Sequence, residues 1–144
     1  MSADARFARI VARFESLSAD DVARLGDIYG DDAHFKDPFN DARGLPAVQR
    51  VFTHMFATLD DPRFVVQDVL VDGARAFVTW DFAFRIRGTR ALRSIHGGSL
   101  LTLGVDGRLS EHLDYWDSAD LFGQLPLLRS AVRWLKRRAG GERG

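Results

Sequence analysis

The sequence contains no cysteine among its 144 residues, which excludes disulfides, thiolate metal sites and a cysteine nucleophile. An excess of one charge is also missing, because 20 basic and 20 acidic residues give a formal net charge of zero. No overall field attracts nucleic acid, and we expect no nucleic-acid partner. Apolar runs fall far short of the ~20 residues of a membrane-spanning helix, and no signal-peptide pattern opens the chain. We expect a soluble, cytoplasmic protein with one domain.

Aromatic residues, in contrast, are abundant. The chain has 11 Phe and 3 Trp, which is more than a minimal core of this size requires. This excess favours an apolar cavity over a solid interior.

The first half of the chain predicts three helices and one short strand. Apolar residues recur at helical spacing over 7–17, and Ser18 can cap a second short helix. Pro46 suits the first turn of a third helix, which Asp60-Asp61-Pro62 ends. Between the second and third helices, alternating apolar residues over 31–41 predict a strand that Asp37-Pro38 closes.

The second half predicts four successive antiparallel strands. Turns at Asp72-Gly73 and Asp106-Gly107 join two pairs of them, and the strands cover residues 64–71, 76–87, 94–104 and 109–117. Helices followed by a strand meander predict an α+β fold. We expect a cone-shaped α+β barrel, in which the N-terminal helices pack on a curved, mainly antiparallel sheet and leave a pocket between them.

The C-terminal segment is basic and amphipathic. We expect a helix over 121–138, which Ser118 can cap and Pro126 interrupts, and a disordered tail over 139–144. From residue 129 onward the chain has six basic side chains and one acidic one. The helix either caps the domain or a dimer partner, which we favour, or lies on an anionic membrane surface through Trp134.

The order of elements and three segments resemble the nuclear transport factor 2-like superfamily. The segments are 29–38, Gly44 at the start of a helix, and 112–117 on the last strand. This superfamily includes ketosteroid isomerase and SnoaL-type polyketide cyclases, and the resemblance covers about residues 5–120. It implies a SnoaL-like domain over that range and a homodimer through the outer sheet face. The superfamily contains both enzymes and binding modules, so the resemblance implies the fold more strongly than the function.

The resemblance to ketosteroid isomerase implies roles for single residues. Its general base, the aspartate before proline, falls on Asp37. Its oxyanion-binding tyrosine falls on Phe14, and its protonated aspartate falls near Ser99. One such donor commonly accounts for ~10²–10³ in rate, so we do not expect the steroid isomerisation itself.

The last strand supplies two further catalytic candidates. Alternation places His112, Asp114 and Trp116 on one face. The resemblance implies that this face lines the cavity, and SnoaL-type cyclases are similar in using an aspartate on a late strand as acid or base. The alternative is that the polar face is solvated and that Leu113 and Tyr115 point inside.

Asp37 also has two interpretations. As a strand residue it would be enclosed by Phe35 and Phe39, and a carboxyl group buried without a positive partner can exchange protons near neutrality. Alternatively, an aspartate before proline fastens a turn through its own hydrogen bonds.

The pocket walls are predicted from apolar faces and small residues. His96 is included because Gly97-Gly98 would let the backbone approach a ligand closely. His112 and Asp114 lack an evident third metal ligand, so we expect no metal and no cofactor. The ligand-binding candidates are Phe14, Phe35, Phe52, Met55, Phe56, Trp80, Phe82, His96, Ser99 and Trp116.

Three functions are compatible with these features. In the first, Asp37 and Asp114 move a proton on a small apolar carbonyl or polycyclic substrate, as in an isomerase, cyclase or dehydratase, and His112 or His96 polarises an oxygen. In the second, the same pocket binds a ligand without turnover. In the third, the domain is a homodimeric interaction module with a packed interior.

Overall fold

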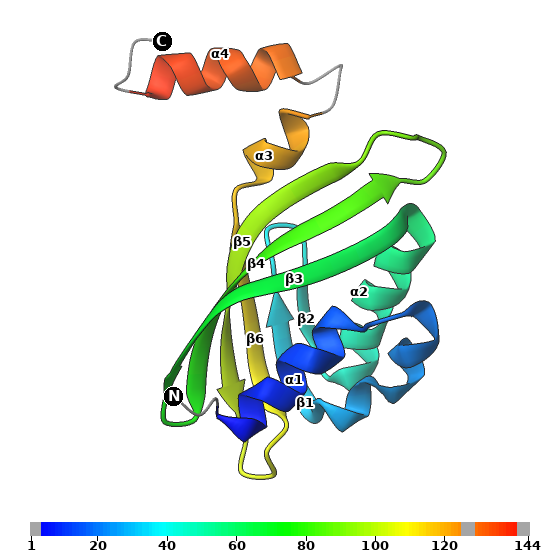
Figure 1. Ribbon diagram of the computed structural model, residues 1–144, viewed down its shortest axis with the longest axis vertical. Helices are drawn as coiled ribbons and strands as arrows, with labels where there is room; N and C mark the ends of the chain where they lie inside the picture. Colours follow the sequence, from blue (N-terminus) through cyan, green and yellow to red (C-terminus); the bar gives the residue numbers. More distant parts are fainter. Residues whose placement is uncertain (1–3, 125–128, 141–144) are drawn as a thin grey trace.

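The computed structural model describes residues 4–124 and 129–140. Helices and strands follow one another along the chain as shown in Figure 1. Their bounds are α1 Ala5–Glu15, η1 Ala19–Asp27, β1 Tyr29–Lys36, β2 Asp41–Arg43, α2 Leu45–Thr58, β3 Leu59–Asp72, β4 Arg75–Ile86, β5 Arg93–Leu103, β6 Leu109–Trp116, α3 Ser118–Phe122 and α4 Arg129–Ala139.

The six strands form one mixed sheet in the order β2-β1-β6-β5-β4-β3. Strands β3 to β6 are antiparallel neighbours, and β1 pairs with β6 in parallel. Helices α1 and α2 lie on one face of this curved sheet, which we call the inner face (Figure 1). The predicted α+β cone is confirmed, but the sheet is open rather than a closed barrel, since its edge strands β2 and β3 do not pair with each other. Helix α2 contacts both edge strands.

Buried apolar side chains and N-terminal caps explain why the first two helices form. In α1, Phe7 and Ile10 are fully buried, and Asp4 caps the helix by accepting a hydrogen bond from the Arg6 amide. The second helix is a 3₁₀ helix with a capping box between Ser18 and Asp21. Its apolar residues recur every third position, which matches three residues per turn. The apolar positions are Val22, Leu25 and Ile28.

Two predicted strand boundaries are wrong. Strand β3 begins at Leu59, so Asp60-Asp61-Pro62 lies within it rather than in a loop. A register shift after Asp60 and a positive φ of 51° at Asp61 accommodate the proline. Strand β1 ends at Lys36, which leaves Asp37 outside the strand.

The C-terminal segment forms two short helices. Asp117 caps α3 by accepting from the Ala119 amide, so the predicted cap Ser118 is the first helical residue instead. Helix α4 extends to Ala139, which we expected in the tail. None of the described residues of α4 is buried, and Lys136 lies 3.6 Å from Asp120. The predicted break at Pro126 and the tail over 141–144 fall outside the described residues.

None of the described helices is long and apolar enough to cross a membrane. The domain boundaries expected at residues 120 and 138 stay predictions.

Candidate functional site

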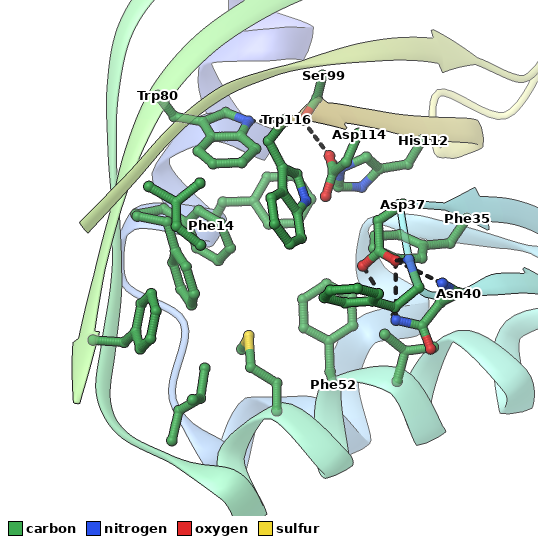
Figure 2. Close-up of a pocket in the computed structure, with 18 of the residues that line it drawn as sticks. Phe14, Phe35, Asp37, Asn40, Phe52, Trp80, Ser99, His112, Asp114 and Trp116 are labelled. Carbon is green, nitrogen blue, oxygen red and sulfur yellow. Dashed lines mark hydrogen bonds and ion pairs between the residues drawn. The ribbon is translucent and has the colours of Figure 1, made fainter. Parts of the chain in front are cut away.

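A cavity of about 330 Å³ lies between the inner face of the sheet and helices α1 and α2. Its size lies at the lower end of the range for small-molecule sites. Most of its wall is apolar (Figure 2). The lining residues are Val11, Phe14, Phe35, Asp37, Phe39, Asn40, Val51, Phe52, His54, Met55, Thr58, Leu59, Phe64, Val66, Val78, Trp80, Phe82, Phe84, Ile86, Ile95, Ser99, Leu101, His112, Asp114, Trp116 and Leu121.

Alternation along two strands builds the sheet side of this wall. On β4 the side chains of Val78, Trp80, Phe82 and Phe84 are all buried on the inner face. On β6 the inner face carries His112, Asp114 and Trp116, whereas Tyr115 is 56% exposed. The polar residues of β6 therefore line the cavity, and the alternative of a solvated polar face is wrong.

A chain of hydrogen bonds joins five side chains in this wall. The Trp80 indole donates from Nε1 to Ser99 Oγ at 2.8 Å, and Ser99 donates in turn to Asp114 Oδ1, as drawn in Figure 2. His112 Nε2 lies 2.6 Å from the same Asp114 Oδ1. On the other side of the ring, His112 Nδ1 lies 2.6 Å from the hydroxyl of Tyr29.

The donors in this chain are consistent with one tautomer of a neutral His112. Tyr29 then donates its proton to Nδ1, and Nε2–H donates to Asp114. Burial of Tyr29, followed by the negative charge of Asp114, raises the pKa of the tyrosine well above its ordinary value, so Tyr29 stays a neutral donor. Within the described residues, Asp114 Oδ2 has no hydrogen-bond partner, and it belongs to a side chain that is only 11% exposed.

Tyr29 is the functional candidate that the sequence analysis missed. It lies in the segment that resembles the superfamily, but no role was assigned to it. The parallel pairing of β1 with β6 brings it to His112, 83 positions further along the chain. The sequence alone carries no signal for this role, because the burial of the Tyr29 hydroxyl within an apolar core is a property of the tertiary structure.

Asp37 lies in the turn between β1 and β2, which corrects its expected place on a strand. Its Oδ1 accepts hydrogen bonds from the Phe39 amide at 2.8 Å and the Asn40 amide at 2.7 Å, and the Asn40 side chain donates to both oxygens (Figure 2). Phe39 is 55% exposed and does not enclose it as a strand neighbour would. The aspartate thus fastens the turn, and it also lines the cavity.

Two predicted ligand-binding residues lie elsewhere. His96 is exposed and bonds to Asp81 at 2.8 Å on the outer face, because its strand neighbours Ile95 and Gly97 take the inner positions. Phe56 does not line the cavity. The other predicted lining residues, Phe14, Phe35, Phe52, Met55, Trp80, Phe82, Ser99 and Trp116, all line it.

The remaining histidines do not build a metal centre with these residues. His34 pairs with Asp41 at 2.6 Å, and exposed His54 lies at the cavity lining. Across residues 4–124 and 129–140, no three His, Asp or Glu side chains are grouped to hold a metal ion.

Solved structures with the same fold include several from bacteria. A putative SnoaL-like polyketide cyclase from Shewanella putrefaciens has a TM-score of 0.75 and 17% identity, over 88% of this chain and 99% of that one. TsrD from Streptomyces laurentii has a TM-score of 0.74 and 19% identity, over 89% and 100%. An LEH-like epoxide hydrolase from M. tuberculosis has a TM-score of 0.70 and 19% identity, over 90% and 96%. At these identities the likeness concerns the fold.

At the sequence level, no curated protein matches the chain. The SnoaL-like domain family, however, matches residues 10–112, which include both residues of the Tyr29–His112 contact. Because this match spans well over half of the chain, the protein belongs to the SnoaL-like domain family, within the nuclear transport factor 2-like superfamily.

Proposed function

We propose that the protein binds a small, mainly apolar molecule in this cavity and catalyses a cofactor-independent proton transfer on it, of the isomerase, cyclase or dehydratase type. One observation carries the proposal. The hydrogen-bond chain from Tyr29 through His112 reaches Asp114, whose second oxygen is left without a partner among the described residues in a mainly apolar wall.

Asp114 is the proposed base. Ser99 and His112 both donate to Oδ1 and hold the carboxylate in one orientation, which leaves Oδ2 to accept a proton from the substrate. Proton transfer by a positioned side chain contributes typically ~10²–10⁴ in rate. The protonated Asp114 then returns the proton to a second atom of the substrate. Asp37, a second carboxylate in the same cavity, is the proposed second proton acceptor.

The similar structures support this choice of reaction type. One is described as a putative SnoaL-like polyketide cyclase and another as an LEH-like epoxide hydrolase. Both descriptions name chemistry on small organic molecules. The position equivalent to an oxyanion donor in ketosteroid isomerase is Phe14, which packs edge-on to His112 with ring centroids 5.3 Å apart. We therefore do not propose steroid isomerisation.

The proton transfer can be tested with an enolisable ketone of suitable size. β-Tetralone is incubated with the protein in D₂O, and exchange at the carbon next to the carbonyl is followed by NMR. We expect the wild type to accelerate exchange and Asp114→Asn to lose at least about 100-fold of that acceleration. Asp81→Asn, on the outer sheet face, is the matched control and should behave like the wild type.

A wild type that binds ketones without accelerating exchange would instead support the second candidate, a binding module without turnover. The apolar wall and the size of the cavity favour that candidate over a purely structural role. Native mass spectrometry of a copurifying molecule would then identify the ligand.

We also propose that two copies pair through the outer sheet face. Register places one apolar residue from each of four adjacent strands in a continuous row across this face. Leu70 is 68% exposed and Phe77 is 38% exposed, and contiguous exposed apolar side chains mark surfaces that bind other proteins. The row consists of Leu70, Phe77, Leu100 and Leu113.

A further inference from the structure

The charged side chains that line the cavity are acidic. Asp37 and Asp114 both line the cavity, and none of the described lining residues is a lysine or an arginine. Each carboxyl group accepts hydrogen bonds from N–H or O–H donors, which is the pattern of an ionised group. Within the described residues, Asp114 contacts His112, which is neutral in the hydrogen-bond chain described above, and Asp37 has no cationic side chain paired with it.

The guanidinium of Arg93 is directed away from the cavity. Arg93 lies on the same face of β5 as Ile95, but its Nη1 donates to the backbone oxygen of Gln124 at 2.5 Å and the side chain does not line the cavity. The carboxylates therefore have no built-in cation to neutralise them within the described wall.

Aromatic rings surround the carboxylate end of the cavity. Phe35 packs edge-on to His112 at 4.8 Å between ring centroids, and Trp116 lies two positions after Asp114 on the same strand face. Trp116 in turn packs against Phe39 at 5.4 Å, next to the turn that holds Asp37. Faces of Trp and Phe rings attract organic cations, most strongly where water is excluded.

We propose that the natural ligand is a small organic cation, an amine or quaternary ammonium group on an apolar body, with Asp114 as the main counter-charge. This rests on the ligand-binding part of the proposed function and names its ligand class. Asp114 contributes more than Asp37, because its side chain is almost completely removed from solvent and charge interactions are stronger there. Anionic ligands are rejected by the same two carboxylates.

The test compares two molecules of nearly identical shape. Phenyltrimethylammonium is the cationic probe, and tert-butylbenzene, in which carbon replaces nitrogen, is its neutral counterpart. Both dissociation constants are measured by ligand-detected NMR for the wild type, Asp114→Asn, Asp37→Asn and Asp81→Asn. Asp81 is the matched control, because it loses the same charge on the outer sheet face.

We expect the wild type to bind the cation, and Asp114→Asn to weaken that binding at least about tenfold while tert-butylbenzene changes by less than about threefold. Asp37→Asn should weaken cation binding by a smaller factor, and Asp81→Asn should leave it unchanged.

Equal losses for both probes, or wild-type binding of tert-butylbenzene alone, would overturn the cation proposal and leave a pocket for neutral ligands intact. If neither probe bound to the wild type, the cation proposal and the ligand-binding part of the proposed function would both fail. Cation binding without ketone exchange would remove only the catalytic part.

Discussion

Tyr29 is a buried side chain whose hydroxyl contacts His112. Its hydroxyl lies 2.6 Å from His112 Nδ1, and its side chain is fully buried. In Tyr29→Phe, His112 Nδ1 stays buried but loses the hydroxyl that donates to it. An unsatisfied buried polar group costs about 1–3 kcal/mol. We expect urea unfolding to show a loss of that size. Tyr115→Phe, at an exposed position, should change the free energy of unfolding by less than about 0.5 kcal/mol.

The same tyrosine predicts how stability depends on alkaline pH. Its pKa is raised in the folded protein, whereas an unfolded tyrosine loses its proton at about pH 10. The stabilisation is therefore fully present below about pH 10 and is lost as the pH rises toward the folded pKa, at up to about 1.4 kcal/mol per pH unit. The difference in unfolding free energy between wild type and Tyr29→Phe should shrink between about pH 8 and about pH 11. A difference that stays constant would contradict this assignment.

At the scale of elements, the turn between β1 and β2 depends on one side chain. Asp37 accepts two backbone amides and the Asn40 side chain. Asp37→Ala removes all of these acceptors, and we expect a loss of about 1–2 kcal/mol in urea unfolding. Asp37→Asn keeps the Oδ1 acceptor and should stay within about 0.5 kcal/mol of the wild type.

This pair of variants separates the turn from the chemistry. If Asp37→Asn were as unstable as Asp37→Ala, its negative charge rather than its acceptor geometry would hold the turn. A loss of exchange activity in a stable Asp37→Asn would point to a direct role in proton transfer.

Helix α4 is the element with the weakest connection to the core. None of its described residues is buried, and Trp134 and Leu135 are 51% and 58% exposed. A chain that ends at Gln124 keeps the contacts of Gln124 with Arg93 and Ser94. We expect its free energy of unfolding to lie within about 1 kcal/mol of the full chain, measured by urea denaturation. A larger loss would show that α4 caps the domain.

The same truncation distinguishes the two roles predicted for the basic segment. Sedimentation with anionic phosphatidylserine vesicles is measured for both forms. Binding by the full chain alone would indicate contact with a membrane surface, and equal behaviour of the two forms would exclude it.

At the scale of the whole molecule, the outer sheet face predicts a dimer. Replacing both Leu70 and Phe77 by lysine places two charges in the apolar row, where they lack partners in a buried interface. We expect analytical ultracentrifugation to give a dimer for the wild type and a monomer for this variant. Replacing Val105 by lysine, at another exposed apolar position, should leave the dimer intact. A monomeric wild type at micromolar concentration would contradict the pairing.

The elements of the fold could be predicted from local patterns. Three such patterns correspond to elements of the structure, and each extends over only a few residues. They are the helical spacing in 7–17, the three-residue spacing from Val22 to Ile28, and the Asp-Gly turns. Alternation also correctly grouped His112, Asp114 and Trp116 on one face. These patterns succeed because the local backbone geometry determines which side chains share a face.

The site required contacts that local patterns do not contain. Tyr29 meets His112 only because β1 lies parallel to the distant strand β6. The Trp80 ring fits on the inner face because Gly97, on the neighbouring strand, has no side chain; the ring lies 2.7 Å from the position of an added Cβ. Asp37 fastens a turn because β1 already ends at Lys36, although the alternation of side chains continues beyond that residue. The sequence by itself determined most of the helices and strands and the faces of their side chains, although it did not indicate the short strand β2. Only the tertiary structure decided which of those faces meet around the cavity, because strand register and the direction of pairing depend on the packing of the entire sheet.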